Sequence, residues 1–275
     1  MIADHEPFIR LGAFFGVFAA VAAWEILAPR RTLTAARRAR WPGNLGIVLL
    51  NTLIVRAIFP AGAVGIALAA EAKEFGLLHA VAIPFWLKAV IGFLLLDLAI
   101  YLQHVLFHAV PALWRLHRMH HADLGFDVTT GARFHPIEIV FSMLVKAAAI
   151  AALGAPAVAV LAFEIALSAT AMFNHANARL PTALDRILRL LVVTPDMHRV
   201  HHSAVPAETN SNFGFNLPWW DRLFGTYRAQ PAAGHEAMTL GLAVFRDARE
   251  LRLDKMLTQP FRGEAGDYAI AQKGI

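Results

Sequence analysis

The segment 81-VAIPFWLKAVIGFLLLDLAIYLQHVLF-107 decides the fold of this 275-residue chain. It is long and apolar enough to cross a bilayer, because about 20 such residues span the hydrocarbon core. It runs directly into a histidine pair, His104 and His108. Imidazole is the commonest metal ligand among side chains. The segment therefore predicts a membrane helix that ends in a metal-binding region.

The rest of the chain has the composition of a membrane protein. Hydrophobic residues make up 57% of it and charged residues only 16%, whereas soluble domains carry about 25% charged residues. Further apolar runs occupy about 8–27 and 45–70. Residues 137–173 hold two shorter runs, which predict either a tight helical hairpin or a re-entrant pair. We therefore expect an all-α, polytopic membrane fold.

Positive charge predicts the orientation of these helices. A short loop after the first apolar run carries five arginines with no acidic residue between them: Arg30, Arg31, Arg37, Arg38 and Arg40. Such loops stay in the cytoplasm. Counting crossings from this loop brings every histidine cluster back to the same side, in a cytoplasmic helical cap, which suits a bacterial inner membrane. We attribute the net charge of +5 to the arginines that orient the helices in the membrane, and it does not indicate a nucleic-acid partner. The acidic Asp4 and Glu6 argue against a cleaved signal peptide.

Three histidine clusters carry most of the functional signal. One has the form HxxxH and two have the form HxxHH. They contain eight of the thirteen histidines: His104, His108, His117, His120, His121, His198, His201 and His202. Residues three or four apart share one face of a helix, so the imidazoles of each cluster can converge. Eight ligands are too many for one ion and suit two, which predicts a histidine-rich dimetal site.

The remaining histidines differ in their expected roles. His175 follows an apolar helix on the expected side of the membrane, so we favour it as a ninth ligand. His135 is either a ligand or a residue that lies beside the site, and the sequence does not decide between the two. His5, His79 and His235 are expected to be solvated or structural. The chain has no cysteine, which excludes thiolate sites and iron–sulfur clusters. An all-nitrogen set does not choose a metal by itself.

Three carboxylates are candidates to support the metal site: Asp97, Glu138 and Asp196. Asp97 lies far into an apolar helix, where an unpaired charge is costly. Its expected partner is the N–H of a ligating histidine or Arg56, and the alternative is that it only ties helices together. Glu138 and Asp196 could offset metal charge. Asp196 could equally cap the helix of the third cluster.

Two further segments predict contact with the membrane surface. Residues 184–193 are apolar with charges spaced along them, which predicts a helix lying in the interface. Trp219 and Trp220 are typical of interfacial anchors. The chain beyond Arg246 is polar and predicts an ordinary tail.

The three motifs, in this order, resemble those of the fatty acid hydroxylase/sterol desaturase superfamily of integral-membrane di-iron oxygenases. The resemblance covers about 44–227 and includes 210-NSNFG-214 and 220-WDRLFGTY-227. It implies a catalytic domain at 44–227. The N-terminal helix and basic loop at 1–43 would precede it, and a cytoplasmic tail at 228–275 would follow it.

The resemblance also implies the chemistry. The eight clustered histidines and His175 would hold two iron ions, although some relatives place a second histidine where this chain has Arg179. Dioxygen would be the co-substrate. Electrons would come from NAD(P)H through a separate reductase, ferredoxin or cytochrome. A lipid-soluble sterol, fatty acyl or alkyl lipid would be hydroxylated or desaturated. The rival interpretation is a non-catalytic metal-binding membrane protein, either a zinc-stabilised scaffold or a metal transporter.

Overall fold

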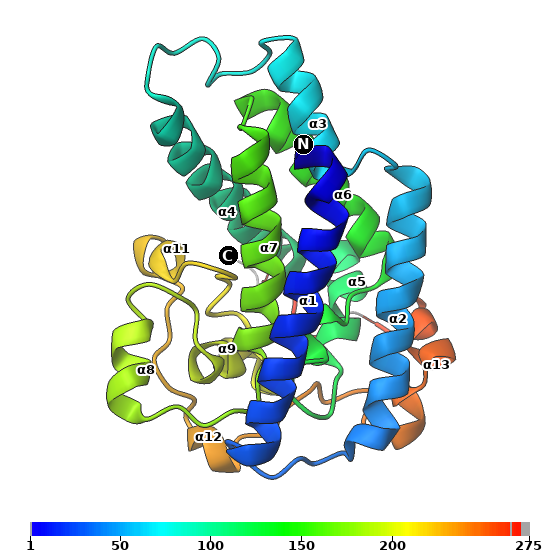
Figure 1. Cartoon of the computed structure of the whole chain (residues 1–275). Helices are drawn as coiled ribbons and strands as arrows, with labels where there is room; N and C mark the ends of the chain where they lie inside the picture. Colours follow the sequence, from blue (N-terminus) through cyan, green and yellow to red (C-terminus); the bar gives the residue numbers. More distant parts are fainter. Residues whose placement is uncertain (1, 265, 271–275) are drawn as a thin grey trace.

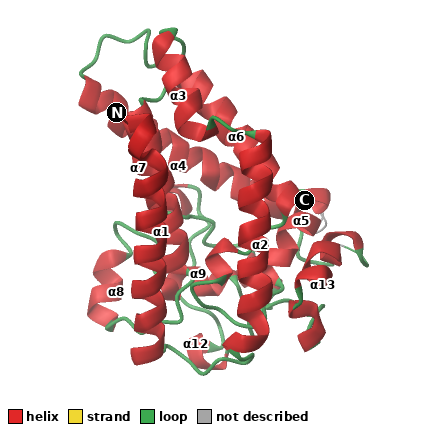
Figure 2. Cartoon of the chain, turned by 45° about the vertical axis from the view of Figure 1, so that its right-hand side comes forward, coloured by secondary structure: helices red, strands yellow, loops and turns green. Residues whose placement is uncertain are grey.

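The computed structural model describes residues 2–264 and 266–270, with side chains from residue 5 onward. The predicted segments 1–43 and 228–275 therefore include residues 1, 265 and 271–275, which lie outside the described part. The described residues form helices and loops without a named strand. The long helices are α1 (Ile2–Leu27), α2 (Arg37–Ile58), α3 (Gly62–Ala72), α4 (Phe85–Ala109), α6 (Pro136–Leu153) and α7 (Ala157–Asn174). Figures 1 and 2 show them side by side, with short helices gathered at one end.

The short elements form a cap at that end of the bundle. They are α5 (Pro111–His121), η1 (Thr130–Ala132), α8 (Thr182–Leu188), α9 (Pro195–His201), α10 (Pro206–Thr209), α11 (Trp219–Leu223), α12 (Gly234–Ala237), η2 (Ala248–Leu251), α13 (Leu253–Thr258) and η3 (Gln259–Phe261). The predicted all-α architecture with a helical cap is confirmed.

Five helical segments of the described chain are long and apolar enough to cross a membrane: His5–Leu27, Arg37–Ala72, Phe85–Ala109, Pro136–Leu153 and Ala157–Asn174. The second joins α2 and α3 across a break at Phe59–Ala61. Residues 137–173, predicted as a hairpin or a re-entrant pair, form two helices of 18 residues each, and both have spanning length. The protein is a multi-pass membrane protein.

A close glycine contact fixes the turn between α6 and α7. Gly154 adopts a left-handed backbone with φ of 62°, a conformation that favours glycine. A Cβ on Gly76 would lie only 2.2 Å from the backbone nitrogen of Gly154. The loop after α3 therefore packs directly on this turn.

The apolar core of the bundle lies between α3, α4, α6 and α7. It includes Val64, Leu96, Ile150 and Phe163, all buried. On the outside of the bundle, α1 presents large apolar side chains, and Phe8 is 75% exposed. This arrangement is typical of helices that face lipid, because the hydrocarbon solvates apolar surface that water would not.

The arginine loop and the cap lie at the same end of the molecule, as the sequence predicted. Arg30 donates to Asp196 beside the third histidine cluster, and Arg31 donates to the carbonyl oxygen of Met238. The prediction that all five arginines lie in the loop was wrong. Arg37, Arg38 and Arg40 belong to α2, and Arg40 is fully buried because it pairs with carboxylates of the cap.

The predicted interface helix at 184–193 is shorter than expected. Helix α8 ends at Leu188, and a turn follows. The chain is diverted because the backbone N–H of Val193 donates to the carbonyl oxygen of Asn216 and does not continue the helix. The exposed side chains of this segment are nevertheless apolar, among them Ile187 and Leu191.

The tail beyond Arg246 is more than a polar extension. It packs on α5, where the guanidinium of Arg118 donates to the carbonyl oxygens of Gln259, Arg262 and Glu264. The ring of Tyr268 stacks on Trp114 with a centroid separation of 5.7 Å. The tail therefore covers one side of the histidine-bearing helix.

Candidate metal centre

Local structure explains how each histidine reaches the site. The last turns of α4 carry His104 and His108, one helical turn apart. Helix α5 starts with Pro111 at its first turn and carries the second cluster at its end. The side chain of Thr194 caps α9, which carries the third cluster. His175 follows α7 directly. All nine imidazoles are buried, with at most 3% of their surface exposed.

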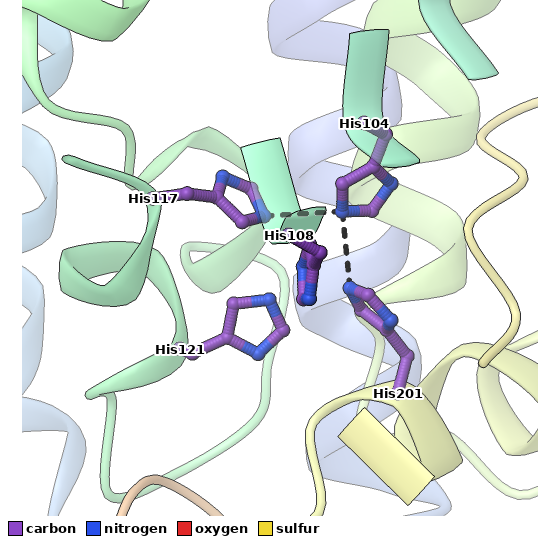
Figure 3. A group of neighbouring side chains, drawn as sticks. All are labelled: His104, His108, His117, His121 and His201. Carbon is purple, nitrogen blue, oxygen red and sulfur yellow. Dashed lines mark hydrogen bonds between the residues drawn. The ribbon is translucent and has the colours of Figure 1, made fainter. Parts of the chain in front are cut away.

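The nine histidines form two groups. The five-histidine group contains His104, His108, His117, His121 and His201, and Figure 3 shows their rings turned toward a common centre. The four-histidine group contains His120, His175, His198 and His202. Within each group the ligand atoms lie within 4.8 Å of one another. Each group therefore draws on more than one motif.

Helix geometry explains why neighbours in sequence separate. Consecutive residues of an α-helix point about 100° apart, since there are 3.6 residues per turn. His120 and His121 consequently point into different groups, and so do His201 and His202. The HxxHH motif thus serves two ion sites from one short helix. The structure brings together all nine histidines that the sequence singled out.

The outer nitrogens of these rings are held by acceptors. The Nδ1 atom of His104 donates to the carbonyl oxygen of Phe213, and that of His201 donates to Ser211, both at 2.7 Å. His175 uses Nδ1 in the same way toward Ala171 at 2.7 Å. His120 donates to the carbonyl oxygen of Arg133 at 3.2 Å. Since a carbonyl oxygen can only accept, Nδ1 carries the proton in these rings.

The inner nitrogens then face each other without a proton. The Nε2 atom of His104 lies 3.0 Å from Nε2 of both His117 and His201. In the other group, Nε2 of His175 lies 3.2 Å from His120 and 3.1 Å from His202. Two unprotonated imidazole nitrogens at this distance cannot hydrogen bond. A separation of about 3 Å is what neighbouring nitrogens show on an ion with bonds of about 2.0–2.1 Å. The donor set fits two metal ions.

Burial keeps these imidazoles neutral. It lowers the pKa of His117 and of His175 to about 3. Burial, reinforced by neighbouring imidazoles, lowers the pKa of His120, His201 and His202 well below the usual value. Because metals bind the neutral form of imidazole, the site is arranged for ligation at ordinary pH.

Of the three candidate carboxylates, only Glu138 contacts a clustered histidine. Its Oε1 atom accepts from Nδ1 of His117 at 2.6 Å. Asp196 instead pairs with Arg30 and Arg199. Asp196 is also not the helix cap, because Thr194 holds that position.

The expected partners of Asp97 were wrong. Its carboxylate accepts from the side chains of Asn216 and Trp220, both at 2.8 Å, and from neither a histidine nor Arg56. Asp97 therefore ties the loop before α11 to α4. The indole N–H of Trp220 thus points to this buried acid, and the anchor interpretation of Trp220 stays a prediction. Trp219 is 42% exposed and donates to the carbonyl oxygen of Leu190.

The other histidines lie outside the two groups. His135 caps α6, where its Nδ1 accepts from the N–H of Ile137 and its Nε2 donates to the carbonyl oxygen of Leu257. His5 is exposed, whereas His235 is buried beside Asp196. His79 packs near Gly154.

Sequence reasoning missed the polar network that holds the loop after α5. Arg40 donates to Asp123 at 2.6 Å and to Asp127 at 2.5 Å, with all three side chains fully buried. Although burial opposes ionisation, Arg40 holds the pKa of Asp123 well below its usual range. The absence of an acidic residue near Arg40 in sequence hid this pairing, since its partners lie more than 80 residues away.

An aromatic pair on the membrane side of the site was also missed. Phe134 stacks on His120, with centroids 4.4 Å apart and an interplanar angle of 11°. The ring of Phe215 lies 5.0 Å from His104 and also packs against the apolar core of the bundle. Phe215 therefore lies between His104 and the apolar core of the bundle, and Phe134 lies beside it, with ring centroids 6.4 Å apart.

Comparisons with known proteins agree with this geometry. A family model described as fatty acid hydroxylase matches residues 89–226, which include all nine histidines. Ornithine lipid hydroxylase OlsE of Rhizobium tropici is 34% identical over 148 residues, which are 54% of this chain and 44% of that protein. Alkylglycerol monooxygenase of Danio rerio is 29% identical over 138 residues, 50% of this chain and 30% of that protein. The human alkylglycerol monooxygenase is 27% identical over 150 residues, 53% of this chain and 31% of that protein.

The matches span less than half the length of these curated relatives. No solved structure matches the chain.

Proposed function

Because the chain belongs to the fatty acid hydroxylase family, we propose that it is a membrane-bound di-iron oxygenase that hydroxylates a lipid with dioxygen. The observation that carries this proposal is the pair of buried histidine groups, whose unprotonated Nε2 atoms face one another at about 3 Å. We propose residues 44–227 as the catalytic domain. Its cap would lie on the cytoplasmic face of a bacterial inner membrane, as the arginine-rich loop favours.

All nine histidines would hold the two ions, five on one and four on the other. Bound iron supplies activation of dioxygen beside a C–H bond. The imidazoles enter as neutral ligands because burial disfavours their protonated form. Carbonyl acceptors orient the rings of His104, His120, His175 and His201. Glu138 does the same for His117, since a ligating histidine usually donates its other N–H to such a group. Phe134 and Phe215 exclude water from the side that a hydrocarbon would approach.

The proposed substrate is a lipid with a hydrocarbon chain. The named relatives are described as acting on an ornithine lipid and on alkylglycerol. In this chain, a groove of about 310 Å³ lies between the first turns of α4 and α7, at the ends of these helices farthest from the histidines. It is lined only by apolar side chains, among them Val90, Phe93 and Val158. A fatty acyl or alkyl chain matches that lining, and a sterol ring is the alternative. Desaturation in place of hydroxylation would use the same histidines.

We propose that electrons come from a separate protein. Among the described residues, the clustered histidines are the candidates to hold a redox-active group. The given sequence contains no glycine-rich motif that would bind a nicotinamide or flavin nucleotide. We propose NAD(P)H as the ultimate source, through a separate reductase and a ferredoxin or cytochrome donor.

The decisive experiment profiles the lipids of cells that express the chain under ¹⁸O-labelled dioxygen. Cells with the unchanged chain should contain a lipid that carries one ¹⁸O atom, and cells expressing His120→Ala or His201→Ala should lack it. Membrane insertion of each variant is checked by fractionation. A zinc-stabilised scaffold or a metal transporter predicts no labelled lipid in any of these cells. That result would overturn the proposed oxygenase.

A further inference from the structure

One side of the cap exposes an apolar surface, which we call the α8–α11 surface. It consists of Leu184, Ile187, Leu190, Leu191, Trp219, Leu223 and Phe224. Leu223 is 69% exposed and Ile187 is 60% exposed. The indole of Trp219 donates to the carbonyl oxygen of Leu190 at 2.7 Å, so the two helices present a joined face. A contiguous apolar surface of this kind marks an interaction site.

The α11 end of this surface lies against the middle of a membrane-spanning helix. Trp220 donates to Asp97 of α4, and the ring of Phe224 stacks on Tyr101 with centroids 5.5 Å apart. Asp97 is twelve residues from each end of Phe85–Ala109. At a rise of about 1.5 Å per residue, these two contacts lie about 18 Å and about 12 Å from the cap end of α4.

The α8 end lies at the level where α1 ends. The N–H of Arg179 donates to the carbonyl oxygen of Ala28, which follows α1 directly, at 2.9 Å. Helix α8 begins three residues later. The last residues of α1 stay apolar and exposed, with Leu27 at 84%. The surface thus extends from the end of one span to the middle of another, about half of a hydrocarbon core that is ~30 Å thick.

Both acidic residues of α8 and α11 are buried. Asp185 is buried and pairs with Arg189 at 2.6 Å, and Asp221 is buried and accepts from the backbone N–H groups of Phe213 and Gly214. Arg186 and Arg222 are exposed. The guanidinium of Arg222 donates to the carbonyl oxygen of Arg189 at 3.0 Å and lies over the ring of Tyr227. Arg186 lies on α8, at the level where α1 ends, and an exposed arginine beside an apolar face is typical of a helix at an anionic lipid surface. Figure 1 shows α8 and α11 on the same side of the molecule, with α11 near α4.

We propose that the α8–α11 surface is buried in the lipid leaflet nearest the cap. The occupant is the bilayer itself, because the surface continues the lipid-facing side of the spans at the same depth. Helix α9, with the third histidine cluster, lies in the segment between α8 and α11. The proposal concerns membrane depth alone and does not depend on the proposed reaction.

The chain contains no cysteine, which permits a direct test by single-cysteine labelling. The test variants are Leu223→Cys and Ile187→Cys. Arg249→Cys serves as the water-exposed control on the cap, since the Arg249 side chain is 80% exposed. Leu49→Cys, on α2 and 62% exposed, is the control on a span. Each protein is reconstituted into vesicles of phosphatidylcholine and phosphatidylglycerol and treated with a water-soluble maleimide.

We expect Leu223→Cys and Ile187→Cys to be labelled at least ~10-fold more slowly than Arg249→Cys, because maleimide needs a hydrated thiolate. Labelling after denaturation verifies that every thiol is intact. Equal rates at the test positions and at Arg249→Cys would overturn the proposal. It would also be overturned if the test positions were protected in native membranes and labelled in vesicles of the pure protein, because a protein partner would then cover the surface. The lipid-labelling experiment can fail without changing these rates.

Discussion

The carboxylate of Glu138 accepts a 2.6 Å hydrogen bond from Nδ1 of His117, and both side chains are buried. Glu138 lies in the first turn of α6, and His117 lies on α5. The bond therefore aligns two helices and one imidazole at once. It also leaves the lone pair of His117 Nε2 directed toward the five-histidine group, since the proton resides on Nδ1.

Replacing Glu138 should weaken metal binding. We expect Glu138→Ala to lower the affinity of the site for iron by about 10–100-fold, the usual effect of removing such a partner from a ligating histidine. Competition with a chelator on the purified protein measures this affinity. Asp196→Ala is the matched control, because Asp196 is an acid of the cap that contacts arginines and no clustered histidine. Equal losses in both variants would show that the effect is a general loss of structure.

Alanine substitution of one ligand in each group should separate the two ions. His120 belongs to the four-histidine group and His201 to the five-histidine group. We expect each single variant to bind less iron than the unchanged chain and to form no oxidised lipid, while inserting normally. Metal analysis by mass spectrometry gives the stoichiometry, and His5→Ala is the control because His5 is exposed. Full iron content in His120→Ala and His201→Ala would contradict the dimetal assignment.

Helical spacing was sufficient to predict the ligand candidates but not their partition. The i, i+3 and i+4 positions place three imidazoles of a motif near one another, so convergence follows from local geometry. Whether His121 joins His108 or His120 depends on how α5 packs against α4 and α9, which local spacing does not contain. The apolar spans were predictable for the same reason, because length and composition determine them.

Long-range polar partners were the part that could not be predicted. Asp97 was correctly identified as a residue that needs a partner, yet its partners lie about 120 residues away in a loop with no regular pattern. Arg40 shows the same difficulty. In the sequence it counts toward the positive charge that predicts the orientation of the helices in the membrane, but in the structure it forms a buried ion pair with Asp123. A positive charge near a membrane helix can mark the cytoplasmic side or can form a buried ion pair, and only tertiary packing distinguishes these two roles.

The two adjacent tryptophans should respond differently to the same substitution. Trp220→Phe leaves the buried Asp97 without one donor, and we expect the free energy of unfolding to fall by about 1–3 kcal/mol. Trp219→Phe removes a bond at an exposed position, and the change should stay within about 0.5 kcal/mol. Thermal unfolding in detergent compares the two proteins. A larger loss in Trp219→Phe would contradict the structural role assigned to Asp97.

His135 should prove to be a helix cap without a part in metal binding. His135→Ala removes the acceptor for the N–H of Ile137, so we expect stability to fall by about 1 kcal/mol. His135→Asn keeps a capping oxygen and should recover most of that loss. Iron content should be unchanged in both variants. Loss of iron in His135→Asn would place His135 among the ligands.

The last prediction concerns Asn210, which links a ligand to the tail. Its side-chain oxygen accepts from Nδ1 of His108 at 3.1 Å, and its amide donates to the carbonyl oxygen of Tyr268 at 2.8 Å. Tyr268 lies beyond the family match at 89–226 and is held in place by a bond from its hydroxyl to the carbonyl oxygen of Ala204. The tail of this chain therefore helps to orient a ligand of the family's motif.

We expect Asn210→Ala to release iron faster on chelator challenge, because His108 loses the acceptor that sets its ring orientation. Tyr268→Phe should have a smaller effect in the same direction, since the hydroxyl bond is lost while the stack on Trp114 remains. Ser211→Ala is the control: Ser211 serves His201 through its backbone carbonyl oxygen, which alanine retains. If Ser211→Ala releases iron as fast as Asn210→Ala, the loop as a whole and not the Asn210 side chain governs retention of the metal.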